Sequence, residues 1–307
     1  MLLSECYFGD VEAIDEGNNF PDYFHSTFIL PSSFSVNALN NKRKYIIVGR
    51  KGSGKTAVQF YLSDKLKERG YLCRFFSFHS DIKPNDFNSA GKTQKIDILG
   101  IGNPKNIFLN YDFREIWTRT FLVKIAEELK TNSLSSPFTD FVLGKRNKLS
   151  SIFEGILKSA SVEVSLDFLG LPATVGFDFS GYQNGEVPLS EFINAALELL
   201  KKYHDTHLLY LFVDELVLSR LDAADDEVRV RAAMVRDILR CARELNNFFV
   251  KWKIDFNIIC ALRPEIRNLL NDMDSEIGKL VDGKSVDLEW DINDGEETLL
   301  YRVLSKK

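Results

Sequence analysis

Short runs of apolar residues, each bounded by polar or turn-forming residues, dominate the hydrophobic pattern of the chain. They are "KYIIV" (44–48), "YLCRFFSF" (71–78), "LLYLFV" (208–213) and "FNIICAL" (256–262). Apolar runs of this length are typical of strands that a parallel sheet buries on both faces. The pattern therefore predicts a mostly parallel sheet with at least these strands.

Between these runs, apolar residues recur every three or four positions, which is the spacing of one helix face. The stretches with this spacing are 56–70, 113–129, 188–204, 225–249 and 264–270. Gly70 and Pro264 stand where a helix ends and begins, respectively. Strands that alternate with helices predict an α/β protein of three layers, in which helices cover both faces of the sheet.

The pattern changes in the middle of the chain. Residues 162–168 and 175–179 alternate between apolar and polar side chains, which predicts an amphipathic β-hairpin. We therefore expect an insertion of hairpin and helical segments at about 131–187. Its apolar face either packs on the core or contacts a partner or another copy of the chain.

A glycine-rich stretch directly follows the first predicted strand. It has the complete spacing of a phosphate-binding P-loop, formed by Gly49, Arg50, Lys51, Gly52, Ser53, Gly54, Lys55 and Thr56. Glycines allow backbone N–H groups to surround phosphate oxygens, and the following helix directs its positive end at them. Lys55 is expected to reach the β- and γ-phosphates, and Thr56 to bind Mg²⁺ through its hydroxyl.

Two adjacent carboxylates end the run at 208–213. Ligands of parallel sheets bind at the carboxyl ends of the strands, so Asp214 is expected to hold Mg²⁺. Glu215 is expected to activate the attacking water. This adjacent pair is typical of ATPases, and the chain has no Asn-Lys-x-Asp sequence that would read guanine. The sequence therefore favours ATP over GTP.

Arg263 follows the run at 256–262 and precedes a proline. This order predicts that Arg263 lies at the carboxyl end of a strand, level with Asp214 and the P-loop. There it either contacts the γ-phosphate or occupies an exposed turn.

With "GRKGSGKTA", "LLYLFVDEL" and "ALRPEI" in this order, the chain resembles bacterial P-loop ATPases of the AAA+/STAND-like and KAP-like branch. The aromatic-rich opening at 6–31 is similar to the segment that precedes the P-loop in those proteins. The resemblance implies an ATPase core at 45–307 behind a lead-in at 1–44 that packs on it. Because several such proteins are encoded near phage-defence genes, it also implies a bacterial, antiviral setting.

The expected function is an ATP-binding and ATP-hydrolysing switch or assembly ATPase. Proteins of this branch usually continue into a C-terminal region, so the chain is either part of a longer protein or relies on a partner effector. A homo-oligomer is the other expected assembly. The opening residues lack the pattern of a signal peptide, no apolar run is long enough to span a membrane, and the four cysteines are scattered. These features predict a cytoplasmic protein with free thiols.

Two other functions stay open. "FSGYQ" (179–183) resembles the signature of ABC-type ATPases that act on DNA, although Tyr182 replaces its second glycine. The other is a nucleotide-sensing scaffold without turnover, against which the intact Lys55 and Glu215 argue. A net charge of −5 does not indicate nucleic-acid binding but allows a local basic patch.

Three arginines, Arg236, Arg240 and Arg243, share one face of the helix predicted after Glu215. Such a face is usually solvated or ion-paired. The alternative is an arginine finger that one subunit offers to the nucleotide of its neighbour.

Overall fold

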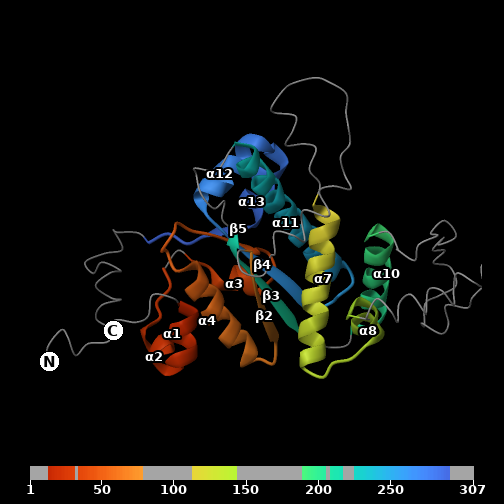
Figure 1. Cartoon of the computed structure of the whole chain (residues 1–307). Helices are drawn as coiled ribbons and strands as arrows, with labels where there is room; N and C mark the ends of the chain where they lie inside the picture. The colour runs from red at the N-terminus through yellow and green to blue at the C-terminus, as the bar shows by residue number, and fades with distance from the viewer. Residues whose placement is uncertain are drawn as a thin grey trace, which may run out of the picture.

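The computed structural model describes residues 13–31, 34–78, 113–143, 189–204, 208–216 and 225–290. In this part of the chain, five parallel strands form one sheet with helices on both faces (Figure 1). The strands are β1 (Ile46–Val48), β2 (Leu72–Ser77), β3 (Leu209–Leu216), β4 (Phe256–Leu262) and β5 (Ser285–Asp287). The predicted α/β class with a parallel sheet is confirmed. The apolar runs predicted the first four strands but not β5, which is only three residues long.

The strand order is β2-β3-β4-β1-β5. Because β4 lies between β1 and β3, the segments that follow β1, β3 and β4 meet at one edge of the sheet. The apolar run predicted a strand that ends at Val213, whereas β3 extends to Leu216. It does so because Ser77 of β2 pairs with Asp214, and the ladder to β4 resumes at Leu216 after an irregularity. Asp214 therefore belongs to β3 instead of following it.

The described helices are α1 (Ala13–Asn19), α2 (Pro21–Thr27), α3 (Val36–Asn40), α4 (Lys55–Lys67), α7 (Arg114–Thr131), α8 (Pro137–Leu143), α10 (Leu189–Lys202), α11 (Asp225–Lys251), α12 (Pro264–Met273) and α13 (Ser275–Lys284). The periodic stretches predicted α4, α7, α10, α11 and α12, and each is confirmed within a few residues of its expected ends.

Alternate residues of β3, an interior strand of the sheet, pack into two separate cores. Leu211 packs with the helices of the α7 and α11 side, whereas Phe212 packs with Val58 and Leu62 of α4. Figure 1 shows α4 with α1 and α2 on one side of the sheet, and α7, α8 and α10 on the other. Burial on both faces explains why the sequence of β3 is a continuous apolar run.

The described part of the N-terminal lead-in lies against α4. The ring of Phe24 meets that of Phe60 edge-on, and Phe28 stacks on Tyr61 with ring centroids 4.4 Å apart. Gly17 lies so close to Phe60 that a Cβ there would be 2.1 Å from the ring. These contacts brace the helix that begins at the P-loop.

Only the beginning of the expected insertion at 131–187 is described. It contains α8, whose Phe138 is fully buried against the main core, so this part is a packed helix. The predicted hairpin at 162–179 and the "FSGYQ" stretch lie outside the described residues.

The three described cysteines, Cys73, Cys241 and Cys260, are free thiols, as the sequence predicted, and Cys6 lies outside the described residues. Burial raises the pKa of the Cys241 thiol to about 12, so it stays protonated at neutral pH.

A buried ion-pair network joins α11 to the segments packed around it. Asp237 is fully buried, and its carboxylate accepts hydrogen bonds from Arg236 at 2.7 and 2.9 Å. It also accepts one from the backbone N–H of Phe113, just before α7, at 2.8 Å. Arg240 bonds both Asp237 and Asp274, and Asp274 caps the amino end of α13. Arg236 and Arg240 are thus ion-paired and Arg243 is exposed, which agrees with the first interpretation, a solvated or ion-paired face.

We expect Asp237→Ala to lower the free energy of unfolding by about 3–5 kcal/mol, because it leaves the Arg236 guanidinium buried without this carboxylate. Denaturant unfolding followed by circular dichroism measures the loss. Asp255→Ala is the matched control, since Asp255 pairs with Lys42 at the surface and should cost about 0–1 kcal/mol. Equal losses in the two variants would contradict the role given to Asp237.

Candidate functional site

The stretch with the spacing of a P-loop, which keeps that name below, connects β1 to α4. Gly52 has a φ of 78° and Gly54 a φ of 87°, a left-handed conformation that residues with a side chain rarely adopt. The backbone N–H of Gly49 donates to the carbonyl of Leu262 at 3.1 Å, which ties the start of the loop to the end of β4. The loop therefore folds back toward its own start, and the amino end of α4 faces the space that the loop encloses.

The side chain of Lys55 returns into the loop that precedes it. Its ammonium group donates to the carbonyl oxygens of Gly49 and Arg50, each at 2.8 Å. Burial lowers the pKa of Lys55, an effect that the nearby carboxylate of Asp214 opposes and the positive charge of Arg263 reinforces. Lys55, Asp214 and Arg263, which the sequence placed in one site, are thus close enough to interact electrostatically.

Thr56 and Asp214 are in direct contact. The hydroxyl of Thr56, in the first turn of α4, donates to a carboxylate oxygen of Asp214 at 2.6 Å. Asp214 is buried at the carboxyl end of β3. A hydroxyl and a carboxylate side by side supply the hard oxygen ligands that Mg²⁺ prefers. The two residues predicted to bind the metal therefore fit that ion.

The described residues contain no group of three or more His, Cys, Asp or Glu side chains that could hold a metal. A P-loop magnesium site does not need such a group, because phosphate oxygens and water complete the coordination. Ser53 adds a second sign that the loop fits an oxygen-rich ligand. Its hydroxyl is buried within the loop and has no hydrogen-bond partner among the described residues.

Glu215 follows Asp214 in β3, and its side chain is outside the part of the chain that the structure describes. Its assignment as the base thus still rests on its position next to Asp214 in the sequence.

Arg263 directly follows β4 and is the last residue before α12. Leu262, its predecessor, pairs with Val48 on one side and with Leu216 on the other. Arg263 therefore stands between the segment that begins the P-loop and the strand that carries Asp214. It is partly buried, which disagrees with the alternative of an exposed turn.

Two residues at the site had no role in the sequence analysis. The indole N–H of Trp290 donates to the carbonyl of Ser53 in the P-loop at 2.9 Å. Gln59 of α4 is fully buried and donates to the carbonyl of Val213 at 3.3 Å, which joins α4 to β3 one turn after Thr56. The only sequence signal was polarity, namely a glutamine on the apolar face of a helix and a tryptophan among acidic residues.

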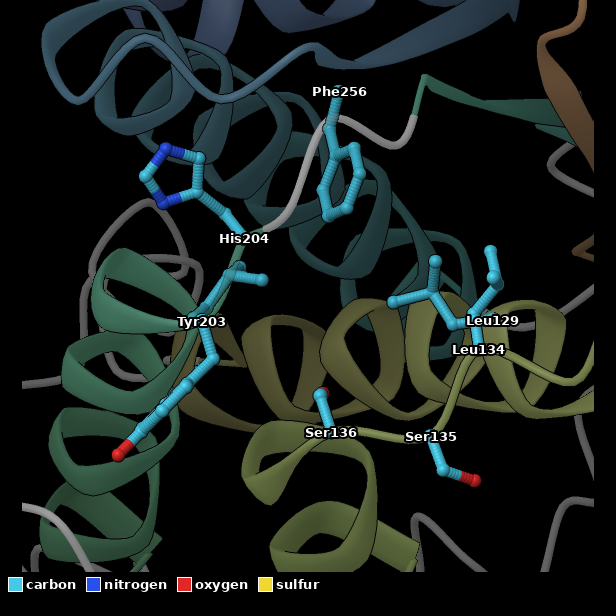
Figure 2. A pocket seen from close by; sticks show the side chains of 8 residues that line it. Leu129, Leu134, Ser135, Ser136, Tyr203, His204 and Phe256 are labelled. Carbon is cyan, nitrogen blue, oxygen red and sulfur yellow. The ribbon is translucent and has the colours of Figure 1, made fainter.

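The surface hollow in Figure 2 lies elsewhere. Its lining comes from the end of α7, the connection from α7 to α8, the end of α10 with the two residues that follow it, and the first residue of β4. It includes Leu129, Leu134, Ser136, His204 and Phe256. Phe256 marks the amino end of β4, whereas the P-loop lies at the carboxyl ends of the strands. A larger hollow is lined by α7, α10 and α11. Neither hollow includes a residue of the candidate site.

Comparison of the chain with protein-family models, curated proteins and solved structures found no match. Among the described helices, none has both the length and the apolar surface that a membrane crossing requires.

We expect Gly49→Ala to destabilise the protein by about 1–3 kcal/mol, the usual cost of overfilling a packed site. A Cβ on Gly49 would lie 2.5 Å from the Ser53 hydroxyl and 3.2 Å from side-chain atoms of Lys55 and Leu288. Gly283→Ala is the control, because a Cβ on that residue of α13 meets nothing within 4 Å. Chemical denaturation compares the two. A loss no larger for Gly49→Ala than for the control would mean that the loop has room for a methyl group at Gly49.

Proposed function

We propose that the chain is an ATPase that binds Mg²⁺ and ATP in the P-loop and uses hydrolysis to drive a conformational or assembly switch. The observation that carries the proposal is the contact between Thr56 and Asp214 at 2.6 Å, beside a loop of P-loop sequence. The contact brings together a hydroxyl and a carboxylate from segments far apart in the sequence, and it supports the proposal because a P-loop ATPase uses this pair to hold Mg²⁺.

In this proposal the triphosphate lies in the curve between β1 and α4. Backbone N–H groups of the loop and the amino end of α4 attract its negative charge. Lys55 exchanges its bonds to the carbonyls of Gly49 and Arg50 for bonds to phosphate oxygens. Neighbouring phosphates also raise the pKa of Lys55, which reverses the effect of burial and keeps the ammonium charged.

Hydrolysis joins a water oxygen to the γ-phosphorus and breaks the bond from that phosphorus to the bridging oxygen of ADP. Thr56 and Asp214 would hold the Mg²⁺ ion, which neutralises charge on the phosphates. Glu215 accepts the proton of the attacking water in the role that the sequence predicts. ADP and inorganic phosphate are the products.

Arg263 is proposed to contact the γ-phosphate, because its place between the P-loop and Asp214 points it toward that end of the nucleotide. The next residue, Pro264, begins α12, and the far end of α12 is held by the contact between Asp274 and Arg240. Loss of the γ-phosphate therefore frees the residue that anchors the amino end of α12. This arrangement supports a switch in which α12 and α13 respond to hydrolysis.

The resemblance to the AAA+/STAND-like and KAP-like branch is part of the proposal. It is supported by the strand order, in which β4 separates the P-loop strand from the strand of Asp214 and carries Arg263 between them. In this proposal the ATPase acts in the bacterial cytoplasm, with further copies of itself or with a partner effector, in a defence system.

We expect the parent protein to bind and hydrolyse ATP in the presence of Mg²⁺. Lys55→Ala should weaken ATP binding by roughly tenfold or more, because charged hydrogen bonds to the phosphates are lost. Glu215→Gln should keep ATP affinity and slow hydrolysis by on the order of a hundredfold, because the amide cannot take the proton. Titration calorimetry measures binding, and phosphate release measures turnover.

Lys65→Ala is the control for Lys55→Ala, since Lys65 lies on α4 but pairs with Glu68 at the surface. It should bind ATP as the parent does. ATP affinity that is unchanged in Lys55→Ala would refute the proposed site, and normal turnover in Glu215→Gln would place the base elsewhere.

We expect Arg263→Ala to bind ADP nearly as the parent does and ATP about 10- to 150-fold more weakly, because only ATP offers the γ-phosphate to the guanidinium. Arg263→Lys should restore little, since an ammonium cannot make the paired bonds of a guanidinium. Arg267→Ala is the matched control one turn further along α12, where Arg267 pairs with Asp282 and Asp287. Equal losses for ATP and ADP in Arg263→Ala would mean that Arg263 only supports the fold.

A further inference from the structure

The segment that follows β5 lies against the P-loop. The backbone N–H of Leu288 donates to the carbonyl of Val48, so this segment continues alongside β1 to the start of the loop. Two residues later, the indole of Trp290 bonds to the carbonyl of Ser53 at 2.9 Å. Trp290 is one of the few large apolar side chains that stay exposed in the described part of the chain, at 36%.

The hydrogen bond uses the edge of the indole. Its donor is the ring nitrogen Nε1, and this contact leaves the faces of the ring available to a second group. Nucleobases stack on such aromatic faces, and the exposed fraction shows that part of the ring still meets solvent.

The strand order fixes which end of a bound nucleotide Trp290 can meet. The metal pair of Thr56 and Asp214 and the arginine at 263 lie toward β3 and β4, on one side of β1. They mark the terminal phosphate end. The segment after β5 lies on the opposite side of β1. A nucleotide whose phosphates run through the loop therefore leaves it on the side of Trp290.

We propose that Trp290 is the stacking platform for the base of the nucleotide that the P-loop holds. This inference rests on the proposed function and adds the subsite for the nucleoside. Stacking on an indole accepts any base, so this subsite holds the nucleotide by its base without selecting adenine by itself. Its bond to Ser53 fixes the indole relative to the loop that holds the phosphates.

The test uses ATP and inorganic tripolyphosphate, which has the phosphate chain but no base, on the full chain with Mg²⁺. Trp290→Ala should bind ATP roughly 5- to 100-fold more weakly and tripolyphosphate as the parent does. Trp290→Phe keeps an aromatic face without the N–H donor, and should bind ATP close to the parent. Trp252→Phe is the control, because Trp252 precedes β4 at the amino ends of the strands.

Fluorescence gives an independent readout, since the chain has three tryptophans. ATP should change the emission of the parent and of Trp252→Phe, and Trp290→Phe should lose this change while still binding ATP.

Three results would overturn the inference and leave the proposed function standing. The first is parent-like ATP affinity in Trp290→Ala, and the second is an equal loss for ATP and tripolyphosphate, which would make Trp290 only a brace for Ser53. The third is a loss in Trp290→Phe as large as in Trp290→Ala, which would assign the effect to the N–H bond. A parent protein that binds neither ligand would overturn the proposed function together with this inference.

Discussion

The hydrogen bond between Thr56 and Asp214 joins residues that are 158 positions apart, and the arrangement of the site depends on it. It can form because β1 and β3 run parallel on either side of β4, so that the end of β3 faces the first turn of α4. Gln59 repeats the connection one turn later, through the carbonyl of Val213. Two polar contacts thus fix α4 to β3 in a region whose other contacts are apolar and do not determine position along the strand.

Much of the fold could be predicted from the sequence because both faces of the sheet are buried. Strands β3 and β4 have apolar side chains on both faces, so their sequences are continuous apolar runs that are easy to recognise. The glycines of the P-loop marked the junction of β1 and α4. The three-residue strand β5 gave no such signal, because Ser285 and Asp287 are polar. The end of β3 was placed too early, since Asp214 is held in the sheet by pairing with Ser77, a long-range contact that local pattern does not contain.

The residues of the candidate site were likewise predictable only where a local motif encodes them. The P-loop, Asp214 and Arg263 were predicted as site residues because each proposed chemical role requires particular residue types at particular places. Trp290 was missed because its relation to the loop depends on β5 pairing with β1, which no motif encodes. For the charged groups of α11, the sequence predicted the position of the residues but not their partners. Their helical face was predicted, but only packing shows that Arg236 is buried against Asp237 and so cannot reach a neighbouring subunit.

The two strands next to β1, namely β4 and β5, lead to opposite sides of the candidate site. On one side, β4 leads to Arg263 and then directly into α12; on the other, β5 leads to Leu288 and Trp290. In the proposed function these are the segments that read the two ends of the nucleotide, the γ-phosphate and the base. Only the first end changes on hydrolysis. In that proposal the contact at Trp290 would hold ATP and ADP alike, while the contact at Arg263 would differ between them, so the differential free energy that a switch requires would act on α12.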